Sequence, residues 1–194
     1  LKTPISADLA VMRTSLIPGL LKAIAHNVSR QQSRVRLFET GLRFLPGDEI
    51  AQTPMIALAA SGLRDAEGWS VGKEAADFFD IKGSVEALLG SLGQRLSFEA
   101  CVFPGLHDGQ SAAILVDGHA VGRMGTIHPT VGKLLGLPGS TVVAEMEQSA
   151  VTALAMPEYE DISKFPETRR DLALVVDKGV ASGDVMTLIR DTPG

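Results

Sequence analysis

A two-residue turn between two apolar segments is the feature that most constrains the fold. Asp117-Gly118 separates residues 112–116 from residues 120–127, and both flanking segments are mainly apolar. This dipeptide readily adopts the positive φ angles that a two-residue hairpin turn requires. We therefore expect the two segments to pair as antiparallel strands within a mostly antiparallel sheet.

Other segments have the composition or length of β-strands. Residues 35–45 read VRLFETGLRFL, and within them Gly41 predicts a β-bulge or a site of close backbone approach. Residues 55–60 form a short apolar run after Pro54, which is typical of a strand covered on both faces in the middle of a sheet. Further strands are expected at residues 96–102, 141–146 and 172–176.

Helical patterns lie between these strands. Ser15 is expected to cap a helix that carries Pro18 in its first turn and repeats apolar residues from Leu16 to Val28. More helices are expected at residues 77–92, 129–135, 148–154 and after Ser182. Strands and helices do not alternate regularly, so the predicted fold class is α+β, with a mostly antiparallel sheet flanked by helices.

The polar segment 157–166 has proline at both ends and is a linker candidate. It predicts a first domain at residues 1–157 and a second unit at residues 158–194 that holds one βα element, which is too small to stand alone. The 194 residues fit one domain plus part of another. Both ends of the chain are expected to lie within a longer protein.

Charge and cysteine content argue against several function classes. A formal net charge of −5 gives no overall attraction for nucleic acid, which disfavours a stand-alone RNA binder. Cys101 is the only cysteine, so the chain can form no internal disulfide or cysteine cluster for zinc, and a cytoplasmic location is expected. No apolar run approaches the roughly 20 residues that span a bilayer, and the N-terminus lacks the order of a signal peptide, so no membrane association is expected.

Few groups of residues indicate a metal, cofactor or RNA-binding site. The four histidines lack metal-ligand spacing and no glycine-rich phosphate-binding motif is present, so we expect no metal and no bound cofactor. Arg169 and Arg170 precede Asp171 and are candidate contacts for RNA phosphates, although an internal Arg–Asp contact is the more common role. The basic stretch from Lys22 to Arg36 has the same two interpretations, a solvated helix face or a contact with RNA or an acidic partner.

Several long strings resemble the bacterial phenylalanine–tRNA ligase beta subunit family. The string MRTSLIPGLL at 12–21 is similar to the family pattern MRTSLLPGLL. LFETGLRF at 37–44, DFFDIKGSVEALL at 77–89 and the run from His107 to Pro129 agree with the family in the same order. KFPETRRDLALVVD at 164–177 resembles the start of the family's C-terminal anticodon-binding domain. The resemblance spans the whole chain and implies a segment from the C-terminal half of such a subunit.

The resemblance implies a fold like the class II aminoacyl-tRNA synthetase catalytic domain at 1–157, followed by a truncated ferredoxin-like element at 158–194. It also implies an enzyme that attaches phenylalanine to its tRNA using ATP and Mg²⁺, assembled as alpha2-beta2 in the cytoplasm. In this family catalysis belongs to the alpha subunit, and tRNA binds the full enzyme. Arg13, Thr14 and Ser15 are the predicted contacts with the alpha subunit.

Missing arginines predict that this segment is inactive by itself, with no catalytic residue. Adenylate formation needs one arginine at the ATP α-phosphate and another at the γ-phosphate. In class II enzymes the first follows the strand that LFETGLRF resembles, where this chain offers only Arg43, which we expect on the strand surface. The second belongs to a glycine-rich motif, whereas this chain has Glu145 and Glu147, which would repel phosphates.

The sequence is therefore compatible with three functions. The leading hypothesis is a non-catalytic assembly module. The second is a regulatory domain that binds a nucleotide or an amino acid and keeps the synthetase fold. The third is a tRNA-binding module that uses a set of basic side chains: Lys22, Arg30, Arg34, Arg36, Arg169 and Arg170.

Overall fold

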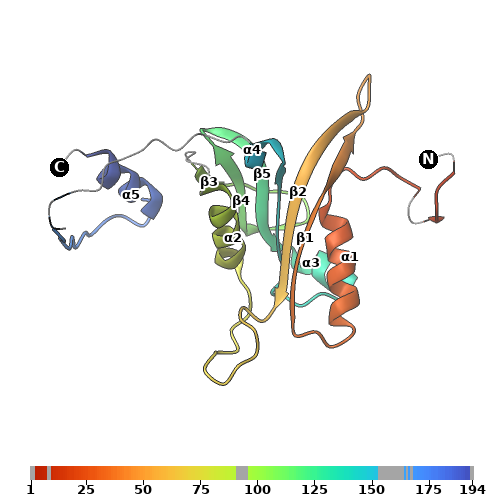
Figure 1. The fold of residues 1–194 in the computed structure, drawn as a ribbon, viewed down its shortest axis with the longest axis horizontal. Coiled ribbons are helices and arrows are strands. Elements are labelled where there is room, and N and C mark those ends of the chain that lie inside the picture. The colour runs from red at the N-terminus through yellow and green to blue at the C-terminus, as the bar shows by residue number, and fades with distance from the viewer. Residues whose placement is uncertain are drawn as a thin grey trace. The chain divides into compact units, whose positions relative to one another are not determined.

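The chain divides into two compact units, residues 1–157 and 158–194, and each is described by itself (Figure 1). The computed structural model describes residues 3–7, 10–90, 96–152, 164, 166 and 168–192. Most of the predicted linker at 157–166, and the predicted end of a helix at 153–154, lie outside these residues.

The first unit is built on a six-stranded sheet with the order β1-β2-β6-β5-β4-β3. Every neighbouring pair is antiparallel. This arrangement confirms the predicted α+β class and the mostly antiparallel sheet. The strands are β1 Arg34–Leu45, β2 Ala51–Gly62, β3 Leu96–Ala100, β4 Leu106–Val116, β5 His119–Ile127 and β6 Val142–Glu147.

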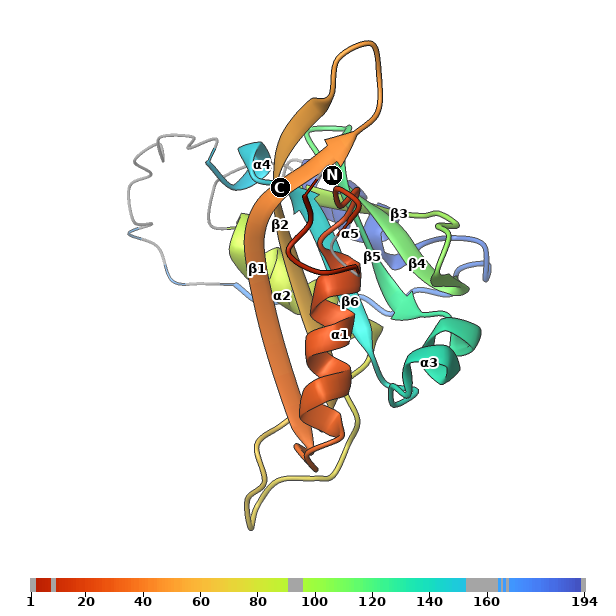
Figure 2. The same cartoon turned by 90° about the vertical axis from the view of Figure 1, so that its right-hand side faces the viewer.

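Helices cover both faces of this sheet (Figure 2). The helices of the first unit are α1 Ile17–Val28, α2 Phe78–Gly90, α3 Pro129–Leu135 and α4 Ser149–Thr152. Helices α1 and α3 pack against one face, whereas α2 and α4 pack against the other. Side chains alternate between faces along a strand, so Val143 of β6 joins the core beneath α1 while Val142 and Ala144 join the core beneath α2. Glu145 and Glu147 consequently share the α1 face.

The predicted hairpin turn is confirmed. Asp117 and Gly118 join β4 to β5 with φ angles of 50° and 79°, as a two-residue turn of this type requires. Most predicted elements agree with the observed bounds to within two residues, but β2 and β4 begin four and six residues earlier than predicted. In β2 the reason is its partner, because β1 and β2 pair continuously from Arg34 and Gly62 to Leu45 and Ala51.

The prediction of a bulge at Gly41 is wrong. Gly41 lies opposite Met55 in an unbroken register. A Cβ atom at Gly41 would overlap the guanidinium of Arg13, so the close neighbour is a side chain rather than backbone. Gly41 therefore makes room for the segment that leads into α1.

The second unit contains the helix α5 Ser182–Asp191, which confirms the helix expected after Ser182. The strand predicted at 172–176 is not observed, because within the described residues this segment pairs with no other strand. A strand requires a hydrogen-bonded neighbour, and the composition of the segment alone does not supply one. None of the helices in the described residues is long and apolar enough to cross a membrane.

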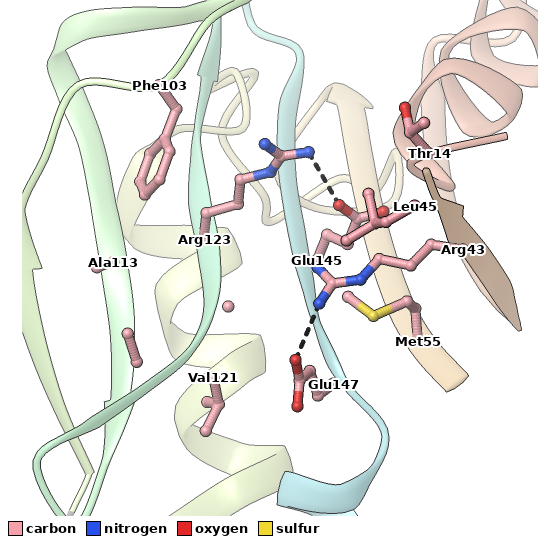
Figure 3. Close-up of a pocket in the computed structure, with 12 residues that line it drawn as sticks. Thr14, Arg43, Leu45, Met55, Phe103, Ala113, Val121, Arg123, Glu145 and Glu147 are labelled. Atoms are coloured by element: carbon pink, nitrogen blue, oxygen red, sulfur yellow. Dashed lines mark hydrogen bonds and ion pairs between the residues drawn. The ribbon is translucent and has the colours of Figure 1, made fainter. Parts of the chain in front are cut away.

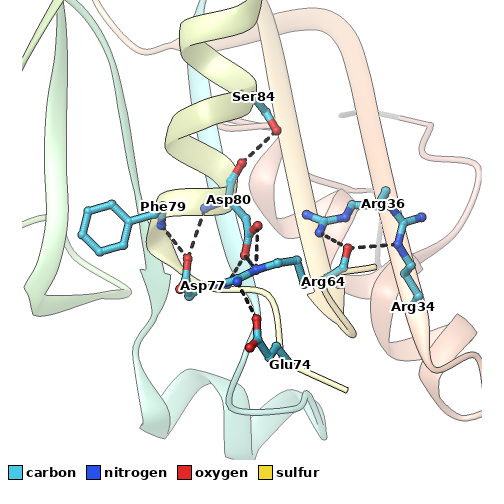
Figure 4. A network of polar contacts seen from close by, with 8 residues as sticks. All are labelled: Arg34, Arg36, Arg64, Glu74, Asp77, Phe79, Asp80 and Ser84. Carbon is cyan, nitrogen blue, oxygen red and sulfur yellow. Dashed lines mark hydrogen bonds and ion pairs between the residues drawn. The ribbon is translucent and has the colours of Figure 1, made fainter. Parts of the chain in front are cut away.

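Arg64 anchors the loop between β2 and α2 (Figure 4). Its guanidinium forms ion pairs with Glu74, Asp77 and Asp80 at 2.7, 2.9 and 3.1 Å. The backbone carbonyl of Arg64 accepts hydrogen bonds from the side chains of Arg34, at 3.2 Å, and Arg36, at 2.8 Å. These two members of the basic stretch thus have internal structural contacts.

The Arg64 cluster should make part of the stability depend on pH. Burial raises the pKa of Asp80, but the Asp77 N–H and the Arg64 guanidinium together outweigh burial and leave that pKa below its ordinary value. Because the pKa of Asp80 is lower in the folded state than in the unfolded state, its contribution to stability is complete above the unfolded pKa of about 4. That contribution is lost as the pH falls through the folded-state pKa. We expect Asp80→Asn to lower the urea midpoint at about pH 7 and to have a smaller effect near pH 3.

The measurement is urea unfolding followed by circular dichroism at both pH values. Asp65→Asn is the matched control, because Asp65 is exposed in the same loop. An equal loss of stability at the two pH values for Asp80→Asn would contradict the prediction.

Candidate functional site

A pocket opens on the α1 face of the sheet, where residues from five strands, β1, β2, β4, β5 and β6, bring charged and apolar side chains together (Figure 3). Its volume is about 450 Å³. The lining includes Thr14, Arg43, Leu45, Met55, Phe103, Val121, Gly122, Arg123, Glu145 and Glu147.

Glu145 is the buried acidic group among the residues that line this pocket, with 2% of its side chain exposed. It lies opposite Arg123 in the β5–β6 register, and Arg123 Nη2 donates to Glu145 Oε2 at 3.0 Å. The other carboxylate oxygen, Oε1, accepts from the Ser15 hydroxyl at 2.9 Å and from the Leu16 N–H at 2.6 Å. A buried carboxylate needs such partners, and Glu145 thereby ties the start of α1 to the centre of the sheet.

The second charged pair joins the edge of the sheet to its centre. Arg43 extends from β1 across β2 and donates from Nη2 to Glu147 Oε1 on β6 at 2.9 Å. Arg43 was expected on the strand surface, but its side chain lines the pocket and is 26% exposed. The odd-numbered residues of β1 face α1, which places Arg43 beside the pocket.

The predicted repulsion of phosphates by Glu145 and Glu147 needs revision, because each glutamate is paired with an arginine. The two arginines and two glutamates sum to a local charge of zero. Arg123 was overlooked because its neighbourhood, G-R-M-G, shows only an apolar strand pattern. An arginine inside an apolar strand pattern does indicate that an acidic partner lies nearby. That partner, Glu145, is 22 positions away and becomes known only from the strand pairing.

The three predicted interface residues, Arg13, Thr14 and Ser15, precede α1, and Thr14 is the one that lines the pocket. Arg13 forms an ion pair with Glu39, donates from Nε to the Leu42 carbonyl at 3.0 Å, and accepts at its own carbonyl from the Phe44 N–H at 2.8 Å. Thr14 lines the pocket and Ser15 binds Glu145. These contacts fix the residues within the unit, and a role at a subunit interface stays a prediction.

Ser15 does not cap α1 as predicted. The helix begins one residue later, with Leu16 at the cap position and no capping side chain there, although Ser15 Oγ accepts weakly from the Ile17 N–H at 3.2 Å. The physical reason is Glu145, whose carboxylate accepts from the Leu16 N–H and fills the role of a cap from a distant strand.

The remaining predicted residues lie elsewhere. Arg169 and Arg170 are exposed in the second unit, and their contact with tRNA stays a prediction. Among the described residues there is no group of three or more histidine, cysteine or acidic side chains that could hold a metal ion.

The fold resembles that of a solved aminoacyl-tRNA synthetase. Desulfitobacterium hafniense PylSc, a pyrrolysyl tRNA synthetase, superposes with a TM-score of 0.50 over 72% of this chain and 48% of that chain. The sequences are 13% identical, so the likeness concerns the fold alone. The class defined by the first unit is therefore an α+β module with an architecture found in a tRNA synthetase.

Sequence comparison identifies the family. The family model for the phenylalanyl tRNA synthetase beta chain CLM domain matches residues 1–148. The phenylalanine–tRNA ligase beta subunits of Vibrio cholerae and Pseudomonas putida are 48% and 50% identical to this chain over its whole length. The chain belongs to the phenylalanyl-tRNA synthetase beta chain family and spans 25% of the length of these relatives.

Proposed function

We propose that the chain is a non-catalytic module of a phenylalanine–tRNA ligase beta subunit, with a fold like the class II catalytic domain, that assembles with the alpha subunit. The observation that carries this proposal is the charge-neutral pocket, in which each arginine already faces a glutamate. The relatives from Vibrio cholerae and Pseudomonas putida are beta subunits of phenylalanine–tRNA ligase, which supports this choice of enzyme.

The electrostatics of the pocket argue against adenylate formation in this unit. A site that stabilises a triphosphate needs cations whose charge is available to the phosphates. Arg43 and Arg123 lie within 2.9 and 3.0 Å of the carboxylates of Glu147 and Glu145, so an incoming phosphate must compete with these carboxylates for the two arginines. The unit is therefore suited to a structural role.

Within the proposed enzyme, ATP and Mg²⁺ act at the alpha subunit and tRNA binds the full alpha2-beta2 assembly in the cytoplasm. Residues 158–194 are then the first part of a ferredoxin-like anticodon-binding domain. Arg169 and Arg170 are the proposed tRNA contacts in that part. Their exposure is compatible with this role.

Edge strand β1 is the proposed contact with the alpha subunit. Phe38 and Leu42 lie on one face of this strand, with 75% and 37% of their surface exposed. Exposed apolar residues on a sheet edge favour association with another chain. The proposal thus extends the predicted interface from Arg13, Thr14 and Ser15 to the strand on which Arg13 packs.

A pair of measurements tests inertness and assembly separately. We expect no ATP–pyrophosphate exchange with phenylalanine from the purified chain, and we expect co-purification with a matching alpha subunit. Phe38→Asp should weaken that association by about tenfold or more, because it places a charge in an apolar contact. Phe79→Asp is the control, since Phe79 is 72% exposed but lies on α2. Exchange activity would contradict inertness, and equal binding by the two variants would contradict the interface.

A further inference from the structure

The loop between β2 and α2 presents the only tryptophan of the chain to solvent. Trp69 is 100% exposed, and Val71, two positions later, is 40% exposed. Residues 65–75 are all exposed, and the loop extends away from the sheet beyond the end of β2 in both views (Figures 1 and 2). Tryptophan has a large apolar ring and is enriched at the centres of protein interfaces. A fully exposed ring at the tip of a loop is therefore suited to contact with another molecule.

The two ends of this loop are held together by several contacts. Leu63 and Ala75 form an antiparallel β-bridge across its base. The Arg64 N–H donates to the Glu74 carbonyl at 2.8 Å, and the Arg64 guanidinium forms ion pairs with Glu74 and Asp77 (Figure 4). A partner thus meets a loop whose base is already in place, so less conformational entropy is lost on binding.

The tip of the loop is a tight turn. The Val71 N–H donates to the Gly68 carbonyl at 3.4 Å, which places Trp69 at the second position of a four-residue turn. A Cβ atom at Gly68 would lie 3.0 Å from Val71 Cγ2, so the Val71 side chain lies close to the backbone of the turn. The turn therefore carries two exposed apolar side chains, a large one and a small one.

Two acidic side chains accompany the ring. Asp65 and Glu67 are exposed, four and two positions before Trp69, and neither forms an ion pair or a side-chain hydrogen bond with another described residue. With Lys73 as the cation of the same segment, residues 65–73 have two negative charges and one positive charge, a net charge of −1. This charge repels RNA phosphates and anionic lipid headgroups and favours a protein surface that carries lysine or arginine.

We propose that this loop inserts the Trp69 ring into an apolar pocket of the alpha subunit, and that basic side chains at the rim of that pocket pair with Asp65 and Glu67. A tryptophan that fills a pocket from which water is excluded contributes strongly to affinity. Charge pairs at the rim mainly accelerate association and select the partner. The inference rests on the proposed assembly with the alpha subunit and adds a second contact to the one proposed at β1.

The single tryptophan makes this contact directly measurable. The 194-residue chain is labelled with 5-fluorotryptophan, so that its ¹⁹F NMR signal comes from Trp69 alone, and unlabelled alpha subunit is added. We expect the signal to shift and to lose its sensitivity to D₂O, because the ring leaves water. Co-purification shows whether the complex forms. An unchanged Trp69 signal in a formed complex overturns this inference alone, whereas absence of a complex contradicts the proposed assembly as well.

Substitution of the ring tests its contribution to binding. Trp69→Ala should weaken binding to the alpha subunit by at least about tenfold, and Trp69→Phe should restore part of the loss. Because the ring is exposed, Trp69→Ala should keep the urea midpoint of the parent chain, which separates lost binding from lost folding. Phe79→Ala is the matched control, since Phe79 is an aromatic residue that is 72% exposed on α2. Equal affinities of Trp69→Ala and Phe79→Ala overturn the inference.

Removal of the two carboxylates tests the basic rim. The double variant Asp65→Asn, Glu67→Gln should associate more slowly with the alpha subunit than the parent chain does, and its association rate should depend less on salt. Lys73→Met removes the cation of the same segment and should change the rate in the opposite direction. Stopped-flow measurements at low and high salt give these rates. An unchanged salt dependence in the double variant overturns the assignment of a basic rim.

Discussion

Replacing Glu145 by alanine is expected to lower the free energy of unfolding by about 3 kcal/mol, because removal of one partner of a buried ion pair leaves the others unsatisfied. Three donors lose their acceptor in this variant: Arg123 Nη2, the Ser15 hydroxyl and the Leu16 N–H. Arg123 is 33% exposed and regains some hydration, so the loss falls at the lower end for buried pairs. For a chain of this size the melting temperature should fall by about 6–12 °C.

Glu147→Ala is the matched control for this experiment. Glu147 also pairs with an arginine, but its side chain is 39% exposed, so its loss should cost less than about 1 kcal/mol. Combining Glu145→Leu with Arg123→Leu should recover part of the stability, because no buried charge is then left without its partner. Equal urea midpoints for Glu145→Ala and Glu147→Ala would show that the buried carboxylate has no special role.

Gly122→Ala is expected to destabilise the first unit by about 3 kcal/mol, through a clash between two backbones. Gly122 lies opposite Met146 in the β5–β6 register. A Cβ atom at this position would overlap the carbonyl of Glu145 and the Cα and Cβ atoms of Met146. Backbone at the centre of a sheet cannot move aside as a flexible side chain can, so the strands must separate. The same movement would disturb the Arg123–Glu145 pair.

Gly83→Ala is expected to change the stability in the opposite direction. Gly83 is exposed within α2, and an added Cβ atom would meet no other atom within 4 Å. Alanine loses less backbone entropy than glycine in a helix, so this variant should gain up to about 1 kcal/mol. Denaturant unfolding of both variants gives the comparison. Similar changes for Gly122→Ala and Gly83→Ala would contradict the close approach of β5 and β6.

The sequence predicted well those turns and helices that depend on residues close together in the chain. The Asp117-Gly118 turn depends on φ angles that these residues adopt by themselves, and the observed hairpin confirms it. The helix at 129–135 begins at a proline and has Gly136 just after its last residue, and it is observed with the predicted bounds. In contrast, β2 is twice as long as the predicted 55–60 because its length is determined by pairing with β1.

The candidate site was only partly predictable for the same reason. Glu145, Glu147 and Arg43 were selected as positions where catalytic groups are missing, but their ion pairs were not anticipated. Arg123 was not selected at all, since nothing in its own segment indicates that it faces Glu145. The strand expected at 172–176 is the converse case. Its composition suits a strand, but within the described residues no other strand pairs with it.

The sequence by itself determined the family, the α+β class and the order of most elements, because these depend on strings and periodicities along the chain. Only the tertiary structure decided that the two glutamates of β6 are neutralised by Arg43 and Arg123, and that Glu145 holds the start of α1. Each of these contacts joins residues more than 20 positions apart, so strand order and register decide whether the side chains meet.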